Sequence, residues 1–72
     1  MPKLVPRKPR EVETILLSQG FILNVSKSSH RQYFHPITKA HTTVPFHSRD
    51  IPPGTLRSII RQSQLSLDLF RK

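Results

Sequence analysis

The sequence of 72 residues contains no cysteine and only four acidic residues. Without thiols there is no disulfide, no thiolate zinc site and no cysteine nucleophile. Two-metal nucleases need several carboxylates at one site, whereas the acids here are scattered along the chain, at Glu11, Glu13, Asp50 and Asp68. The four histidines stand five or six residues apart, a spacing that matches no standard zinc motif. We therefore expect neither a metal ion nor another cofactor.

Long apolar runs are also missing. No stretch approaches the roughly 18 apolar residues that a membrane-spanning helix needs, and no apolar segment of a signal peptide follows the basic N-terminus. We therefore expect a cytoplasmic protein. A chain this short is expected to form a single domain, residues 1–72, and to bury only about 60% of the surface of the unfolded chain. So small a core has no room for a large internal pocket, which favours an active site at the surface.

Positive charge, by contrast, is abundant. Twelve lysines and arginines give the chain a formal net charge of +8 and a pI near 11.3. Such an imbalance favours binding to a polyanion. Nucleic acid is the first candidate partner and an acidic protein is the second; a basic surface that has no specific partner is the alternative.

Hydrophobic periodicity predicts five elements in the order α-β-β-β-α. A basic arm over residues 1–8, either loose or simply a frayed terminus, precedes a folded core over residues 9–70. The helices are expected over residues 9–19 and from 52–55 to about 64, and the strands over 21–26, 30–35 and about 40–45. Short turns between the strands favour an α+β fold, an antiparallel meander with both helices on one face. The double-stranded-RNA-binding domain has the same order of elements.

The end of the first helix is marked by a glycine. Gly20 is expected to adopt the left-handed conformation that ends a helix, and Phe21 to fold back onto the last helical turn. From this point the apolar period changes to two. Phe21, Leu23 and Val25 are therefore predicted to form the apolar face of the first strand.

The second helix has a clear division into two faces. Arg57 and Arg61 lie four residues apart on the outer face, where they are compatible with phosphate contact. Four residues have inward spacing, namely Leu56, Ile59, Ile60 and Ser63. After this helix, Ser66 is the expected cap of a short final turn.

One histidine stands among cations and small polar residues. His30 follows the loop Lys27-Ser28-Ser29 and precedes Arg31. RNA supplies its own nucleophile, the 2′-hydroxyl, and its cleavage needs a base for that proton, cations for the phosphorane charge and an acid for the leaving oxygen. Imidazole acts as base or acid at neutral pH, while Lys27 and Arg31 would bind the phosphate and loop N–H groups would cradle it. The alternative is a strand histidine that hydrogen-bonds the loop.

Other aromatic residues have open roles at this point. A second proton carrier is either His35 or water. Tyr33 and Phe34 either stack on bases or belong to the core. His47 is expected to fix the connector before the second helix.

Five segments of the chain stand in a specific order and spacing. They are Pro9-Arg10-Glu11-Val12, Gln19-Gly20-Phe21, Ser29-His30 with Tyr33 and His35-Pro36, Val44-Pro45-Phe46-His47-Ser48, and Pro53-Gly54-Thr55-Leu56-Arg57-Ser58-Ile59-Ile60-Arg61-Gln62. Together they resemble the HicA toxin family, the mRNA-cleaving halves of bacterial toxin–antitoxin pairs. The likeness covers about residues 9–70, nearly the whole chain.

The resemblance implies a double-stranded-RNA-binding-like fold that is used as a ribonuclease. In the family, the histidine of a Gly-Ser-His or Gly-Gly-His motif is catalytic, and His30 holds that position here. The resemblance also implies that mRNA is cleaved and translation blocked until an acidic HicB-type antitoxin binds, and we expect that antitoxin to cover His30. The family usually has glycine in place of Ser28. Because glycine lets a phosphate approach the backbone closely, the serine either narrows this approach or adds a hydroxyl contact.

The sequence therefore predicts a metal-independent endoribonuclease toxin with His30 as its general acid or base. The residues predicted to contact RNA are Lys27, Ser28, Ser29, Arg31, Arg57 and Arg61. A non-catalytic RNA-binding module of the same fold is the alternative.

Overall fold

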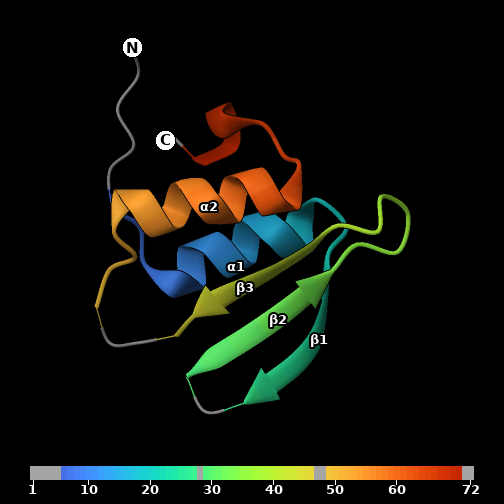
Figure 1. Cartoon of the computed structure of the whole chain (residues 1–72), viewed down its shortest axis with the longest axis horizontal. Coiled ribbons are helices and arrows are strands. Elements are labelled where there is room, and N and C mark those ends of the chain that lie inside the picture. Colours follow the sequence, from blue (N-terminus) through green and yellow to red (C-terminus); the bar gives the residue numbers. More distant parts are fainter. Residues whose placement is uncertain (1–5, 28, 47–48, 71–72) are drawn as a thin grey trace.

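The computed structural model describes residues 6–27, 29–46 and 49–70. Two helices and three strands follow one another in the predicted order α-β-β-β-α, which confirms the α+β fold (Figure 1). Their bounds are α1 Pro9–Ser18, β1 Ile22–Lys27, β2 His30–Phe34, β3 His41–Pro45 and α2 Pro53–Ser63, and a short 3₁₀ helix, η1, follows over Leu67–Phe70. Neither helix in the described part of the chain has the length and apolar character that a membrane crossing requires.

The three strands form one antiparallel sheet in the order β1-β2-β3. Side chains alternate between its two faces, so that Tyr33, Thr42 and Val44 are buried whereas Gln32 and Thr43 are exposed. Tyr33 and Thr42 are cross-strand partners and therefore point to the same face. Glu13 of α1 hydrogen-bonds Tyr33, and Gln62 of α2 hydrogen-bonds Thr42. Both helices therefore cover the same face of the sheet, as predicted.

The other face of the sheet is here called the open face. It consists of every second residue of β2, starting with His30, together with the residues of β1 and β3 that pair with them. Apart from Lys27, whose side chain is not among those described, its residues are Ile22, Val25, His30, Gln32, Phe34, His41, Thr43 and Pro45. It is the part of the sheet that a large ligand can reach.

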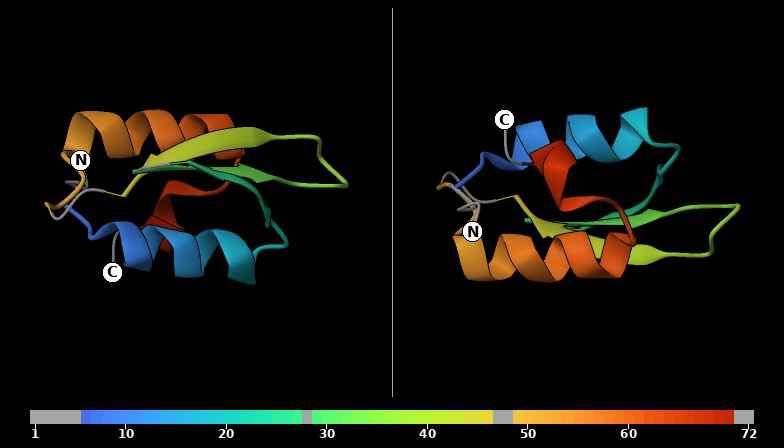
Figure 2. Two further views of the ribbon diagram at one scale, coloured as in Figure 1. Left: turned by 90° about the horizontal axis from the view of Figure 1, so that it is seen from below. Right: turned by 90° about the horizontal axis from the view of Figure 1, so that it is seen from above.

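The core lies between the covered face and the helices. η1 packs against α1 and lies beside it in Figure 2, and its Phe70 is fully buried. The buried apolar residues are Val12, Leu16, Phe21, Tyr33, Ala40, Val44, Ile51, Leu56, Ile59, Ile60 and Phe70. Every element except β1 contributes to this set, so the core holds the helices against β2 and β3 in particular.

The ends of α1 form as the sequence predicts. Pro9 occupies the first turn, where a missing N–H costs nothing, and the Glu11 carboxylate accepts the Lys8 backbone N–H at 3.1 Å. At the other end Gly20 has a φ of 98°. Phe21 then folds back, since its N–H donates to the Leu16 carbonyl at 3.0 Å and its ring is buried.

The prediction for the apolar face of β1 is wrong from Val25 onward. Leu23 pairs with Tyr33 of the covered face, although it is 39% exposed, whereas Val25 is half-buried and pairs with Gln32 of the open face. The cause is a register shift between Leu23 and Val25. A bulge of this kind adds one residue to the strand and moves the following side chains to the opposite face.

The two faces of α2 are confirmed. All four residues predicted to point inward are buried, and Arg57 and Arg61 are exposed. The predicted cap of the final turn is also present, because the Ser66 hydroxyl accepts the Asp68 backbone N–H at 3.2 Å. Ser66 thereby starts η1, which delivers Phe70 to the core.

Part of the predicted basic arm is built into the fold. The Arg7 backbone pairs with Ile51, through hydrogen bonds of 3.4 and 2.7 Å, and its Nε donates to the Phe70 carbonyl at 3.1 Å. Lys8 forms the cap of α1. Arg7 thus joins the start of the chain to its last turn, and residues 1–5 lie outside the described residues.

Candidate functional site

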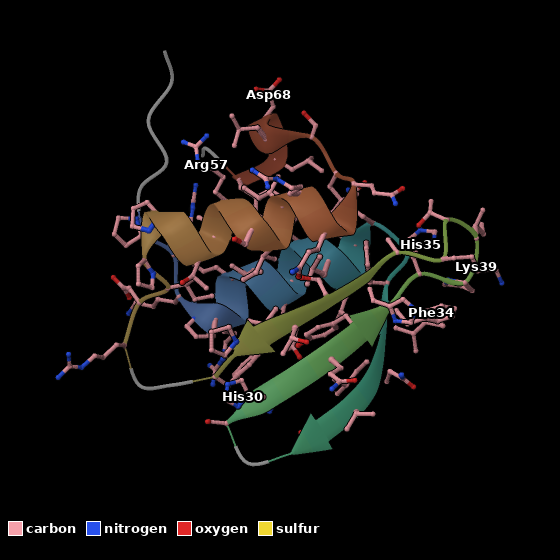
Figure 3. All side chains as sticks on the ribbon, viewed as in Figure 1. His30, Phe34, His35, Lys39, Arg57 and Asp68 are labelled. Carbon is pink, nitrogen blue, oxygen red and sulfur yellow. The ribbon has the colours of Figure 1, made fainter. Side chains whose placement is uncertain are left out.

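His30 is the first residue of β2 and its side chain is exposed. It belongs to the open face, with Lys27 of β1 and Pro45 of β3 as its cross-strand partners. Figure 3 shows it at the first end of the central strand β2. A ring in this position is open to a large substrate, which the predicted chemistry requires.

The turn before His30 is fastened to the end of β3. The Phe46 backbone N–H donates to the Ser29 carbonyl, so the chain on both sides of His30 is fixed by hydrogen bonds to its neighbours. Ser29 is half-buried. Of the other predicted contacts, Lys27 is described by its backbone alone, and Ser28 and the connector residue His47 lie outside the described residues.

Arg31 lies on the opposite face of the sheet from His30, because successive side chains of a strand alternate. Its Nη1 is 2.9 Å from Oε2 of Glu13 on α1, and its guanidinium stacks on the Phe46 ring at 4.1 Å from the centroid. The structure therefore does not bring Arg31 together with His30. A role for Arg31 on the same phosphate as His30 has no support in this geometry; its contacts fix the start of β2 to α1 and to the end of β3.

Glu13 is the centre of a polar network that the sequence did not reveal. The Tyr33 hydroxyl donates to the same Oε2 atom at 2.5 Å. This hydrogen bond, and after it the contact with Arg31, lower the pKa of Glu13 below its ordinary value of 4.5, although burial opposes the change. Burial, and then Glu13, raise the pKa of Tyr33, and the pair with Glu13 raises that of Arg31. One available signal was the position of Glu13, directly after Val12 and therefore at the border of the buried stripe of α1.

Replacing Glu13 with glutamine is expected to lower the free energy of unfolding by about 1 kcal/mol at pH 7, because the ion pair with Arg31 is lost while an acceptor for Tyr33 remains. Since the folded protein holds the pKa of Glu13 below its unfolded value, this stabilisation is present above about pH 4.5 and is lost as the pH falls through the folded pKa. Thermal melts from pH 7 to pH 3 should therefore show a smaller difference between variant and wild type at the acid end. The control is Asp50→Asn, at an exposed position of the connector before α2, where the same change of charge should cost less than about 0.5 kcal/mol. An equal loss from the two variants at pH 7, or a difference that persists at pH 3, would contradict the assignment.

The arginines of α2 do not join His30. Arg57 and Arg61 are exposed on the outer face of this helix. Figure 3 shows Arg57 on the side of α2 that is turned away from the sheet, well separated from His30. Their predicted contact with RNA stays a prediction, and it concerns a different part of the surface from the one that holds His30.

His35 has a structural role in place of the proposed catalytic one. It follows β2 at the end opposite to His30, about 16 Å away at the rise of a strand (Figure 3). Its Nε2–H donates to the Gln19 carbonyl at 3.0 Å, and its Nδ1 accepts the N–H groups of Ile37 and Thr38, both at 3.2 Å. His35 is thus too distant to be the second proton carrier at the phosphate that His30 reaches.

None of the four acidic residues lies on a strand. Glu13 reaches the sheet from α1, where its carboxylate contacts Arg31 and Tyr33 on the covered face. In the described ranges, no three histidine, aspartate or glutamate side chains come together as metal ligands would. The region around His30 is therefore one in which a polyanion meets no carboxylate of β1, β2 or β3.

Comparison with known families gives one match. The family model described as the HicA toxin of bacterial toxin–antitoxin systems matches residues 9–65. A comparison with curated proteins gives no match. The matched span includes both helices, all three strands and His30. This confirms the resemblance seen in the sequence, and the chain belongs to the HicA toxin family.

Proposed function

We propose that this HicA-family toxin is a metal-independent endoribonuclease that cleaves mRNA and blocks translation, with His30 as its general acid or base. The observation that carries the proposal is the exposed position of His30 at the start of β2, on a sheet face without carboxylates. The formal net charge of +8 supports a polyanionic substrate. Membership of the family supports the toxin role.

The proposed reaction uses the nucleophile of the RNA itself. His30 removes the proton of a 2′-hydroxyl while that oxygen attacks the adjacent phosphorus, and the bond from phosphorus to the 5′-oxygen breaks. The leaving oxygen takes up a proton, from water or from the imidazolium, and the products are a 2′,3′-cyclic phosphate and a 5′-hydroxyl. General acid–base catalysis by a placed imidazole typically accelerates such a step by about 10²- to 10⁴-fold.

Binding of the RNA backbone is proposed to involve the loop before His30. Lys27 supplies a positive charge, while Ser28 and Ser29 supply N–H groups and hydroxyls of the kind that bind phosphate oxygens. Arg57 and Arg61 would contact phosphates farther along the RNA, from the outer face of α2. The likeness of the element order to the double-stranded-RNA-binding domain supports an RNA ligand but does not identify the reaction.

We also propose that the protein pairs with an acidic antitoxin of the HicB type that covers His30. Toxins of this family belong to toxin–antitoxin systems, which supports a protein partner. The excess of positive charge on the chain favours an acidic one. A partner on the open face would block both the histidine and the approach of RNA.

The decisive experiment compares two substrates in the presence of EDTA. Purified protein is incubated with an RNA and with the same sequence made entirely of 2′-deoxynucleotides. We expect the RNA to be cut to fragments with 2′,3′-cyclic phosphate ends and the deoxy substrate to stay intact. Cleavage of both substrates would overturn the proposed mechanism. Binding of RNA that weakens steeply with salt without any cleavage would instead support the RNA-binding module.

A further inference from the structure

The open face carries a second feature, at the end of β2 opposite to His30. The rings of Phe34 and His41 are in contact, with centroids 4.8 Å apart and planes inclined by 43°. Nζ of Lys39 lies 5.8 Å from the centroid of the Phe34 ring. Figure 3 shows Phe34 and Lys39 together at this end of the sheet and His30 at the other end. We call Phe34, Lys39 and His41 the aromatic cluster.

The cluster is not part of the core. His41 and Lys39 are exposed and Phe34 is half-buried, and the cross-strand partner of Phe34 on β1, Ile22, is 54% exposed. An aromatic ring with a purely structural role would be expected in the core under the helices, where Tyr33 lies. The cluster instead leaves the His41 and Lys39 side chains exposed, with the half-buried Phe34 ring beside them.

We propose that the aromatic cluster binds an unpaired base of the RNA substrate by stacking, so that the preferred substrate is single-stranded at this point. Aromatic side chains on an open sheet are the usual stacking surface for single-stranded RNA. Lys39 adds a cation beside the ring, which suits the phosphate of the same nucleotide. The inference rests on the proposed function, since it supplies a second contact for the RNA that His30 cleaves.

The spacing of the two sites fits one RNA strand that runs along β2. Four residues separate Phe34 from His30, which corresponds to about 13 Å at the rise of a strand. A stacked nucleic-acid strand covers this length with about four nucleotides at 3.4 Å each, and an extended strand with fewer. Between the two sites the open face carries Gln32 and Thr43, which are exposed and uncharged. A strand of RNA therefore meets no repulsion on its way.

The charge of the open face and the accessibility of the bases together favour a single-stranded RNA as the ligand. No acidic residue lies on the three strands, so the face is complementary to a polyanion. In a duplex the bases are paired and stacked on one another, and a ring on a flat sheet cannot reach their faces. An unpaired base can stack on Phe34 without the disruption of a base pair.

The test uses the absence of tryptophan from the chain. Phe34→Trp creates the single tryptophan of the chain at the cluster, which can be excited selectively over Tyr33, in a His30→Ala background that slows cleavage of the RNA. We expect its emission to be quenched on addition of a short single-stranded RNA and much less on addition of the corresponding duplex. The matched control is Leu17→Trp in the same background, because Leu17 is 47% exposed on α1, which packs on the covered face. Its emission should change little with either RNA.

Affinity provides the second measurement. Phe34→Ala and His41→Ala, again with His30→Ala, should each weaken binding of the single strand about tenfold in fluorescence anisotropy, whereas Leu17→Ala should not. Phe34→Leu, which keeps apolar volume but has no π-face, should behave like Phe34→Ala, and circular dichroism confirms that each variant is folded. Because His41 is exposed, its variant remains informative even if Phe34→Ala unfolds.

The outcomes separate this inference from the proposed function. Stacking is overturned if Phe34→Leu and His41→Ala bind RNA with unchanged affinity, or if RNA quenches the emission of Trp at positions 34 and 17 equally. The cluster would then be a candidate surface for a protein partner. Cleavage of RNA by the His30→Ala background at close to the wild-type rate overturns the proposed role of His30 and not the stacking. Absence of RNA binding in every variant overturns both.

Discussion

Alanine in place of His30 is expected to lower the rate of RNA cleavage by about 10²- to 10⁴-fold, the usual contribution of a general acid or base. The side chain is exposed, so its removal leaves no cavity and should change the free energy of unfolding by less than about 0.5 kcal/mol. The measurement is a single-turnover cleavage rate at saturating protein, with EDTA present. Expression of the toxin alone should arrest growth, and expression of His30→Ala should not.

The control for this variant is another exposed histidine of the same sheet face. His41→Ala should weaken RNA binding, as proposed for the aromatic cluster, but leave the saturating rate within about threefold of wild type, because a binding contact raises the substrate dissociation constant without changing the chemical step. The two substitutions thus separate chemistry from binding. A saturating rate in His30→Ala close to that of wild type would remove His30 from the mechanism.

The faces of α2 show what periodicity determines well. Its four inward residues are all buried, because a helix that packs along its whole length must direct residues three and four apart to the same side. The alternation of β2 was equally readable, since it already placed Arg31 and His30 on different faces. The prediction that Arg31 binds the phosphate at which His30 acts treated neighbours in the sequence as neighbours in space, and this was its weakness.

The parts of the site that could not be predicted depend on pairing between distant segments. Glu13 and Arg31 are 18 residues apart in the chain, and only the packing of α1 on the sheet brings them together. The contact between Phe34 and His41 requires the register of β2 against β3. The bulge in β1 has no marker in its sequence, because Asn24 is neither glycine nor part of a turn motif. Local periodicity contains none of this information.

The junction between α1 and β1 depends on the absence of a side chain at one position. Gly20 has a φ of 98°, and a Cβ atom there would lie 2.8 Å from Nε2 of His35. This ring cannot move aside freely, because its two nitrogens are held by the backbone of Gln19 on one side and of Ile37 and Thr38 on the other. The ring also contacts Phe21 edge-on, with centroids 5.1 Å apart. Gly20 and His35 therefore form one unit that joins the end of α1 to the turn after β2.

Gly20→Ala is consequently expected to lower the free energy of unfolding by about 2–4 kcal/mol, the sum of backbone strain at positive φ and of the loss of hydrogen bonds to a displaced imidazole. In a domain whose total stability is about 3–5 kcal/mol, the melting temperature should fall by about 8 °C or more, at about 4–8 °C for each kcal/mol. The only other glycine provides the control: a Cβ at Gly54 meets no atom within 4 Å, so Gly54→Ala in α2 should be neutral or stabilising by up to about 1 kcal/mol. In a His35→Ala background the clash disappears, and Gly20→Ala should then cost only the strain of its backbone, about 1–2 kcal/mol. If Gly20→Ala melts with the wild type, or costs the same whether or not His35 is present, the ring is not what confines this position.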